Sequence, residues 1–162
     1  MADIMMYDEA HYFGDKSGTT ITLGGVITSL TESTNPVEST KQYIHEKEGT
    51  VSITSFSNEF PITMDMVSGD EVFEDFYNIF YTRATGTDCK RDHYIVNLWE
   101  PVEGSENTYK CRKINQTVEI TDCNGEAGEQ KQLSGSLKGG SFVYGTFNTS
   151  TKTFTQDTTP GL

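Results

Sequence analysis

The sequence is short of basic residues. Its 162 residues include 12 Lys and Arg against 24 Asp and Glu, which gives a formal net charge of −12 at pH 7. Protein contacts to nucleic-acid phosphates come mainly from Lys and Arg. The charge balance therefore argues against a protein that binds nucleic acid along a basic groove.

Apolar content is also low. Hydrophobic residues make up 34% of the chain, and adding glycine still leaves the fraction below the ~45–50% usual in globular domains. No apolar run approaches the ~20 residues of a membrane helix, and Met1–Met6 lacks the basic and apolar regions of a secretory signal. Aromatic residues, at 11%, argue against disorder. We therefore expect a single folded domain with a thin core, partly completed by other subunits.

Cysteine is scarce, and its spacing matches no zinc site. Cys89, Cys111 and Cys123 are an odd number with no C-x-x-C pair, and the sequence has no H-x-x-x-H motif. We expect reduced thiols, with one disulfide and one free thiol as the alternative. The sequence predicts neither a metal site nor a cofactor.

Catalytic groups do not gather in any recognisable pattern. His11, His45 and His93 fall on a predicted arm, a loop and a strand, and we interpret His93 as a surface histidine. No nucleophile is paired with a base, and no glycine-rich loop has the lysine or the following helix that phosphate binding needs. We predict that the protein is not an enzyme.

One helix is predicted, over residues 68–83. Ser68 to Glu71 fits a capping box, and apolar side chains recur at helical spacing after it. This wide aromatic face is typical of core packing against a sheet. Its members are Val72, Phe73, Phe76, Tyr77 and Phe80.

The rest of the chain is predicted to be β-structure. Alternating and β-branched segments favour strands, at residues 19–30, 50–64 with a turn at Ser57-Asn58, 91–99, 108–122, and a hairpin of 131–138 with 141–147 around Gly139-Gly140. The predicted fold class is mainly β, a β-sandwich or partial barrel with one flanking helix.

Three segments are expected to extend from this body. Residues 1–18 are predicted to be an N-terminal arm and residues 156–162 a C-terminal tail. Residues 31–48 carry almost no apolar side chain, and Asn35-Pro36 breaks regular structure. Because this segment lies between two strand-like segments, we predict a long β-hairpin arm that mediates interactions.

The C-terminal segment resembles a known family. Residues Val118 to Thr155 read VEITDCNGEAGEQKQLSGSLKGGSFVYGTFNTSTKTFT. This stretch is similar to the closing segment of tail tube (major tail) proteins from siphophages of Gram-positive bacteria. The order of arm, strand pair, helix and sheet fits the same family across most of the chain.

The resemblance implies a structural protein of the virion tail, assembled in the host cytoplasm. Subunits of that family form rings, usually hexameric, that stack into a hollow tube through which DNA is ejected. The implied partners are other copies of the chain and the tape measure, terminator and distal tail proteins. DNA would pass only transiently, without specific binding, and no membrane is involved. A non-contractile tail is favoured over a contractile one or a phage-derived particle.

The resemblance also suggests roles for individual residues. Arm residues expected to contact the next ring are Thr34, Asn35, Pro36, Val37, Glu38, Lys41 and Tyr43. Alternating polar positions expected to face the lumen are Thr50, Ser52, Thr54, Thr117, Glu119 and Thr121. Six copies at −12 give −72 per ring, and an acidic lumen repels DNA phosphates.

Two other functions are compatible with a β-rich chain. A monomeric carbohydrate-binding β-sandwich would need exposed aromatics on one sheet face, whereas Trp99 and Tyr94 are predicted on opposite faces. A lipocalin-type barrel would need a signal segment and a polar ligand site, and the sequence shows neither. Ring assembly discriminates the tail tube hypothesis from both.

Overall fold

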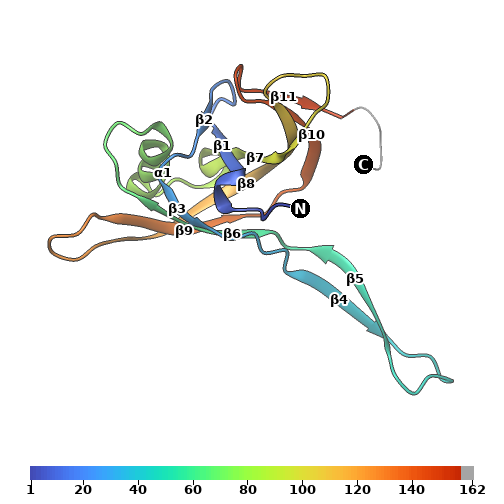
Figure 1. Cartoon of the computed structure of the whole chain (residues 1–162). Coiled ribbons are helices and arrows are strands. Elements are labelled where there is room, and N and C mark those ends of the chain that lie inside the picture. The colour runs from blue at the N-terminus through green and yellow to red at the C-terminus, as the bar shows by residue number, and fades with distance from the viewer. Residues whose placement is uncertain (158–162) are drawn as a thin grey trace.

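Strand β8 (Thr108–Asn124) is the central strand of the main sheet and pairs with three other strands (Figure 1). The computed structural model describes residues 1–157. Along one edge, β8 pairs with β7 (Lys90–Pro101). Along the other edge it pairs first with β10 (Phe142–Asn148) and then with β9 (Gln132–Lys138). The two halves of this strand therefore belong to two differently oriented parts of one sheet.

The remaining strands extend these two parts. β1 (Glu9–Gly14) and β2 (Ile21–Leu23) continue from β7, and β11 (Thr153–Gln156) continues from β10. β6 (Glu59–Asp65) and β3 (Ile27–Leu30) continue from β9. All pairs are antiparallel, in a nine-stranded sheet ordered β2-β1-β7-β8-β9-β6-β3 with β10 and β11 at the side.

The sheet curls until its two ends approach each other. Its outermost strands, β2 and β3, are consecutive in the chain and joined by residues 24–26. The Gly24 amide donates to the His11 carbonyl (2.8 Å), and the Val26 carbonyl accepts from the Asp65 amide (2.9 Å). The sheet is not closed into a barrel. The prediction of a mainly β fold with one helix is confirmed.

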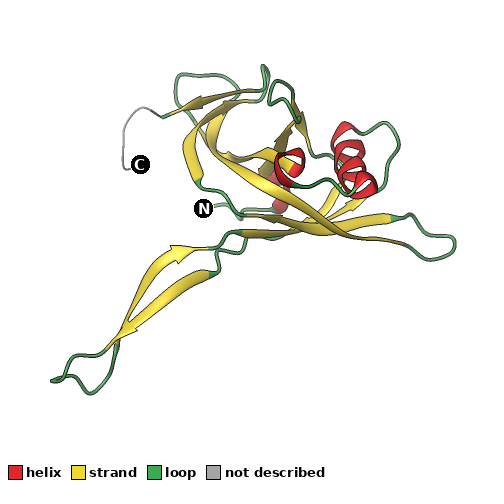
Figure 2. Ribbon diagram, turned by 180° about the vertical axis from the view of Figure 1, so that it is seen from behind, coloured by secondary structure: helices red, strands yellow, loops and turns green. Residues whose placement is uncertain are grey.

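Helix α1 (Glu71–Thr82) covers one face of the sheet (Figures 1 and 2). Phe76 is fully buried, and Val72 and Phe73 pack with it into the main core; Tyr77 and Phe80 are half-buried at its margin. The sheet contributes apolar side chains from both halves: Phe13, Leu30, Phe60, Ile62, Met64, Ile95, Val118, Leu133 and Leu137.

The helix begins two residues later than the predicted capping box. Asp70 is the N-cap, and its Oδ1 accepts a hydrogen bond from the Phe73 amide at 2.9 Å. Glu74 Oε1 accepts from the Gly69 amide at 3.0 Å. The predicted Ser68–Glu71 box is therefore wrong. Gly69, at φ +93°, turns the chain so that Asp70 rather than Ser68 reaches the free amides.

Replacing Asp70 tests this correction. We expect Asp70→Ala to lower the free energy of unfolding by about 1 kcal/mol, the usual cost of losing an N-cap. Ser68→Ala is the matched control and should change stability by less than about 0.5 kcal/mol. Urea unfolding followed by circular dichroism measures both. Equal losses in the two variants would contradict the assignment of the cap.

A second, smaller core lies on the opposite face of the sheet. The rings of Tyr12 and Tyr94 pack on Phe147, with centroids 4.6 Å and 5.7 Å away, and Val96 and Cys111 complete the buried cluster. The predicted N-terminal arm over 1–18 is therefore wrong for residues 9–14. They form β1 because Tyr12 and Phe13 project from opposite faces, one into each core.

Strands β9 and β10 do not form the predicted hairpin. Both lie along the same edge of β8, since Thr117 pairs with Lys90 on one side and Lys138 on the other. Gly139 and Gly140, at φ +82° and +84°, redirect the chain between them. The chain thus crosses from one half of the sheet to the other without reversing.

The hairpin arm is longer than its polar sequence suggested. It consists of β4 (Pro36–Lys41) and β5 (Thr50–Phe56), which form a separate two-stranded sheet projecting from the body (Figures 1 and 2). The predicted range 31–48 missed the whole returning strand. The Ser57-Asn58 pair is not a hairpin turn: β5 and β6 belong to different sheets, and the Ser57 amide donates to the carbonyl oxygens of Thr34 and Asn35, both at 3.1 Å. Of the predicted tail, residues 158–162 lie outside the described residues.

Polar side chains are buried between the sheet and the helix. Arg91, 4% exposed, binds both carboxylate oxygens of Asp75 at 2.7 and 3.0 Å and thereby ties α1 to β7. His93 is 1% exposed and Gln116 is equally buried. The interpretation of His93 as a surface histidine is therefore wrong, because its side of β7 is the side that faces the main core.

Candidate interaction surfaces

The part of the sheet formed by β9, β6, β3 and the second half of β8 has two contrasting faces. One face carries the apolar residues that α1 covers. The register places polar side chains on the other: Thr117 beside Lys138 and Glu59, then Glu119 beside Ser136, then Asp122 beside Ser134 and Thr63. No described element packs over this polar face as α1 packs over the other. We call it the polar face.

The polar face is acidic and internally hydrogen-bonded. Lys138 Nζ lies 3.2 Å from a carboxylate oxygen of Glu119 and 3.9 Å from one of Glu59. Gln132 donates to Asp65 at 3.2 Å. Four carboxylates (Glu59, Asp65, Glu119 and Asp122) against one lysine leave a formal charge of −3 on this face.

The predicted lumen residues divide into two groups. Thr117, Glu119 and Thr121 lie on β8, with Glu119 and Thr121 exposed and Thr117 half-buried. Thr50, Ser52 and Thr54 lie on β5 in the arm, apart from the polar face. The structure therefore does not bring the two sets together on one surface. Alternation identified exposed polar positions in both strands but carries no information about which sheet a strand joins.

The part of the sheet with the polar face has two unpaired edges. β7 pairs with β8 only as far as Thr117, so residues 118–124 have β9 on one side and no strand of the described chain on the other. β3, at the opposite end, pairs only with β6. Exposed edges of this kind are templates for pairing with another chain.

A groove runs beside the free edge of β8. Its volume is about 410 Å³, and its lining includes Phe80, Ala84, Val118 and Ile120. The edge thus offers unpaired backbone groups next to the partly exposed apolar side chains of Phe80, Ala84 and Ile120. This combination suits the docking of a neighbouring strand.

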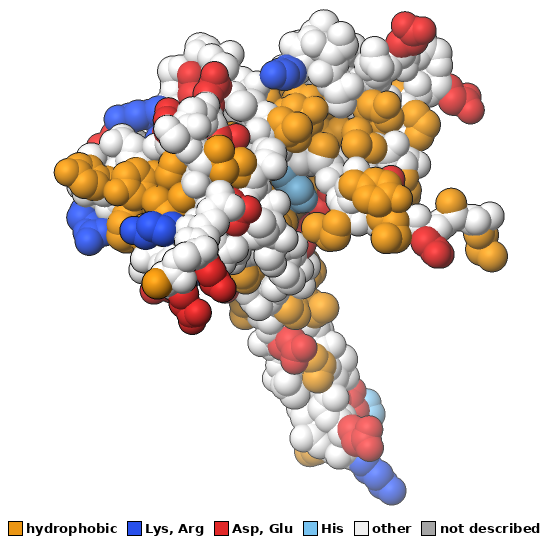
Figure 3. Space-filling view, turned by 60° about the vertical axis from the view of Figure 1, so that its left-hand side comes forward, with side chains coloured by type: hydrophobic (Ala, Val, Ile, Leu, Met, Phe, Trp, Pro, Cys, Tyr) orange, Lys and Arg blue, Asp and Glu red, His pale blue; other side chains and the backbone are white. Residues whose placement is uncertain are grey.

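The arm carries an apolar stripe on one face. A bulge between Val37 and Glu38 sets an extra residue, Thr54, into β5, and its hydroxyl donates to the Val37 carbonyl at 3.0 Å. The bulge brings Phe56 onto the same face as Ile53 and Val51. These side chains are 55–58% exposed; Figure 3 shows hydrophobic side chains along the arm.

The predicted contact residues occupy the base, one strand and the tip of the arm. Asn35, at φ +43°, donates to the Ser57 carbonyl at the base, and Lys41 lies over the Tyr43 ring near the tip, 5.0 Å from its centroid. Thr34 lies at the base, and Pro36, Val37 and Glu38 lie on β4. Sequence reasoning missed the stripe on β5 as an interaction surface, although the spacing of Val51, Ile53 and Phe56 was a usable signal.

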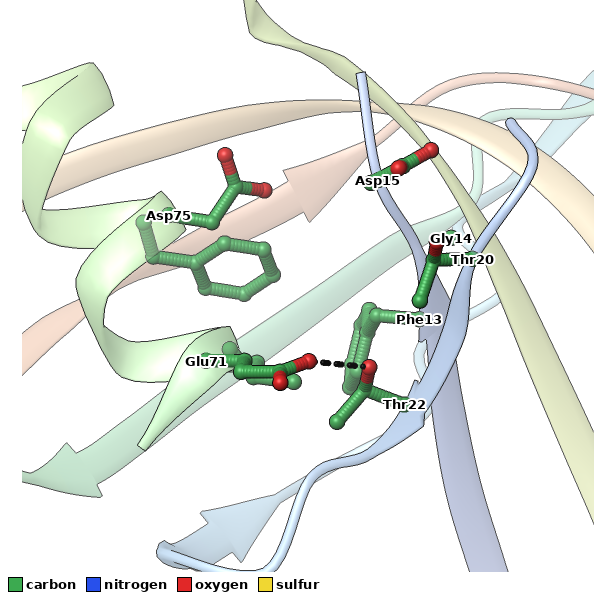
Figure 4. A pocket seen from close by; sticks show the side chains of 9 residues that line it. Phe13, Gly14, Asp15, Thr20, Thr22, Glu71 and Asp75 are labelled. Carbon is green, nitrogen blue, oxygen red and sulfur yellow. Dashed lines mark hydrogen bonds between the residues drawn. The ribbon is translucent and has the colours of Figure 1, made fainter. Parts of the chain in front are cut away.

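A small pocket lies between α1 and the β1–β2 hairpin (Figure 4). Its volume is about 290 Å³, and it contains three carboxylates. Glu71 accepts from the Thr22 hydroxyl at 3.0 Å, and Asp75 binds Arg91. Hydrogen bonds from Ser17 and neighbouring amides lower the pKa of Asp15. Each carboxylate thus has a structural partner.

The described residues show neither a metal site nor a membrane helix. Within residues 1–157, no group of three or more His, Cys, Asp or Glu side chains is placed to hold a metal ion. Over the same residues, no helix is both long and apolar enough to cross a bilayer. Cys89, Cys111 and Cys123 are free thiols.

Comparison with known proteins adds a structural relative. No family model matches the sequence, and no curated protein matches it. The fold is similar to a chain of the cryo-EM structure of the anti-feeding prophage baseplate, determined with six-fold symmetry. The TM-score is 0.54 at 6% sequence identity, over 89% of this chain and 96% of the other. At this identity the similarity establishes a shared fold.

Proposed function

We propose that this chain is a structural subunit of a phage tail tube that assembles into hexameric rings stacked into a hollow conduit. The observation that carries the proposal is the four-stranded part of the sheet, which has a helix-covered apolar face, an acidic polar face and two unpaired edges. The similarity of fold to a chain from a six-fold symmetrised phage-type assembly supports it.

The two unpaired edges provide the lateral contacts of a ring. Residues 118–124 of one subunit would pair with β3 of the next, so each edge is covered by a copy of the same chain. A head-to-tail contact of this kind closes into a ring when the rotation from one subunit to the next divides a full turn evenly. Closure removes the exposed edges that otherwise promote uncontrolled aggregation.

The polar face would line the lumen of such a ring. Six copies of a face with a formal charge of −3 place −18 around the channel wall. Thr117, Glu119 and Thr121 belong to this wall, whereas Thr50, Ser52 and Thr54 belong to the arm. Screening over ~8–10 Å at physiological salt confines the repulsion of DNA to the neighbourhood of the wall. DNA would pass without binding.

The arm would join one ring to the next. A two-stranded ribbon cannot bury its own apolar side chains, so Val51, Ile53 and Phe56 remain exposed unless another surface covers them. The predicted contacts from Thr34 to Tyr43 lie on the same ribbon. The tape measure, terminator and distal tail proteins would meet the tube at its lumen and ends, in the virion tail.

Assembly of the purified chain tests the proposal. We expect residues 1–162 to elute as oligomers in size exclusion and to form rings or tubes of uniform width in negative-stain microscopy. A stable monomer at high concentration, with no ordered assembly at any salt concentration, would refute the proposal. A monomer retained on a polysaccharide resin would instead favour the carbohydrate-binding alternative.

A further inference from the structure

A chain of four polar side chains crosses three strands inside the protein. Glu9 Oε1 lies 3.1 Å from His11 Nε2 on β1. His11 Nδ1 lies 2.9 Å from His93 Nε2 on β7, and His93 Nδ1 lies 2.9 Å from Gln116 Oε1 on β8. These contacts join three adjacent strands side chain to side chain, and neither the tail tube function nor its surfaces use them.

The two imidazole rings are held in an apolar surrounding. His93 stacks on Phe13 with ring centroids 4.6 Å apart, and Phe60 from β6 meets it edge-on at 5.4 Å. Helix α1 contributes Phe76, which packs edge-on against Phe13. Water is therefore largely excluded from His93, which is 1% exposed.

Few charged groups act on this pair. Glu9 on β1 is its direct partner. Arg112 on β8 acts electrostatically on both Glu9 and His93, and it donates two hydrogen bonds to the Glu32 carboxylate, at 2.7 and 2.9 Å. Arg91, on the same face of β7, is neutralised by Asp75.

Geometry limits how many protons the pair can hold. A nitrogen–nitrogen distance of 2.9 Å accommodates one hydrogen atom between His11 and His93. If both rings were imidazolium, each of the facing nitrogens would carry a hydrogen. The folded protein therefore holds at most one imidazolium at this site, whereas the unfolded chain takes up two protons below a pH of about 6.5.

Protons have a route to the site. His11 lines a groove of about 550 Å³ that also contacts Met6, Leu23 and Leu98. The groove follows the seam where the two ends of the curled sheet approach each other. Protonation of His11 can thus act directly on the contact between the two ends of the sheet.

We propose that the Glu9–His11–His93–Gln116 chain is an acid-sensitive latch that holds β1 against β7 and keeps the seam of the sheet closed. Near neutral pH the single shared hydrogen bond ties the two strands together. A second proton on the pair removes that bond and places two cations in contact. β1 and the adjoining connection between β2 and β3 (residues 24–26) then unfold before the rest of the protein.

The pKa shifts of His93 and Glu9 also make the folded state less stable as the pH falls. Burial, then His11 and then Arg112 lower the pKa of His93 from 6.5 to about 3. The nearby His11 imidazole lowers the pKa of Glu9. Both folded-state pKa values lie below the unfolded ones, so both contributions are present at neutral pH and are lost on acidification. The His93 contribution declines as pH falls from 6.5 towards 3, and that of Glu9 declines below 4.5.

Stability measured against pH tests the latch on the full chain. From pH 7.5 to 4.5 we expect the unfolding equilibrium constant of the unmodified protein to rise about tenfold per pH unit below pH ~6, the effect of one excess proton taken up on unfolding. His93→Gln should flatten this dependence. His45→Gln, at an exposed position in the arm tip, is the matched control and should retain it. An unchanged pH dependence in His93→Gln would overturn the proposal.

Two measurements on the unmodified protein keep the test independent of the variant. Hydrogen exchange at pH 5 should show residues 9–14 losing protection before β8 does. Nuclear magnetic resonance should show that His11 and His93 never both become imidazolium while β1 is protected. If both rings become imidazolium with β1 still protected, the latch does not exist.

Discussion

Excision of the hairpin arm is expected to abolish tube formation while the body of the subunit still folds. The cut should remove residues 36–56, because deleting β4 alone would leave β5 without a partner. The arm forms its own two-stranded sheet, and no residue of β4 or β5 is buried. The body therefore loses no core contact.

The base of the arm makes this deletion feasible. The Ser57 amide lies 3.1 Å from the carbonyl oxygens of Thr34 and Asn35, so a short glycine linker can join the two ends. Urea unfolding should show near-normal stability, and negative-stain microscopy should show no tubes at concentrations where the unmodified chain assembles. Tubes of normal length would mean that the arm does not join the rings.

The apolar stripe gives this experiment a finer version. Replacing Val51, Ile53 and Phe56 together by serine removes the surface that we propose is covered in the tube. Replacing Ser39 and Ser52, which pair with each other across the arm, by alanine is the matched control. We expect the first variant to lose stacking and the second to keep it. Normal stacking of the first variant would show that the stripe does not join the rings.

Gly140→Ala is expected to destabilise the folded protein strongly. A Cβ at Gly140 would lie 2.2 Å from the Asn115 carbonyl oxygen and 2.8 Å from a carbon of the Ile114 side chain. Its φ of +84° is also unfavourable for alanine, by about 1–2 kcal/mol. Backbone displacement of overpacked strands adds about 1–3 kcal/mol. We therefore expect the free energy of unfolding to fall by about 2–5 kcal/mol.

Gly139 offers a matched control for Gly140. Its φ is +82°, but a Cβ there meets no atom within 4 Å. Gly139→Ala should therefore cost only the conformational term, about 1–2 kcal/mol. Urea unfolding of the two variants separates the close approach of the strands from backbone strain. Equal losses would show that the crossing beside β8 is not tightly packed.

Sequence reasoning performed best where the pattern is local. The 3.6-residue period from Val72 to Phe80 identified the helix and its buried side, and β-branched alternation identified most strands. The errors occurred where a neighbour in space decides the outcome. Ser68 is a good N-cap residue, but the turn at Gly69 places Asp70 at the helix start.

The candidate surfaces show the same division. Polar alternation at Thr117, Glu119 and Thr121 predicted an exposed face on β8, and the structure places it opposite the helix-covered core. The same alternation at Thr50, Ser52 and Thr54 belongs to the arm. His93 is a residue whose burial the sequence did not indicate, since its neighbours Asp92 and Tyr94 gave no sign of it. His93 is buried because side chains from β1, β6 and β8 contact it on that side of β7.

By itself, the sequence determined the class of the fold, the position of helix α1, the existence of a protruding hairpin and the acidic character of the protein. These features follow from the types of residue and from their spacing within one or two helical turns or strands. The tertiary structure alone decided which strands share a sheet, where the arm ends, which polar face is continuous and that two histidines share one hydrogen bond. Those features depend on pairing between segments tens of residues apart, and a two-residue period is the same whichever partner a strand adopts.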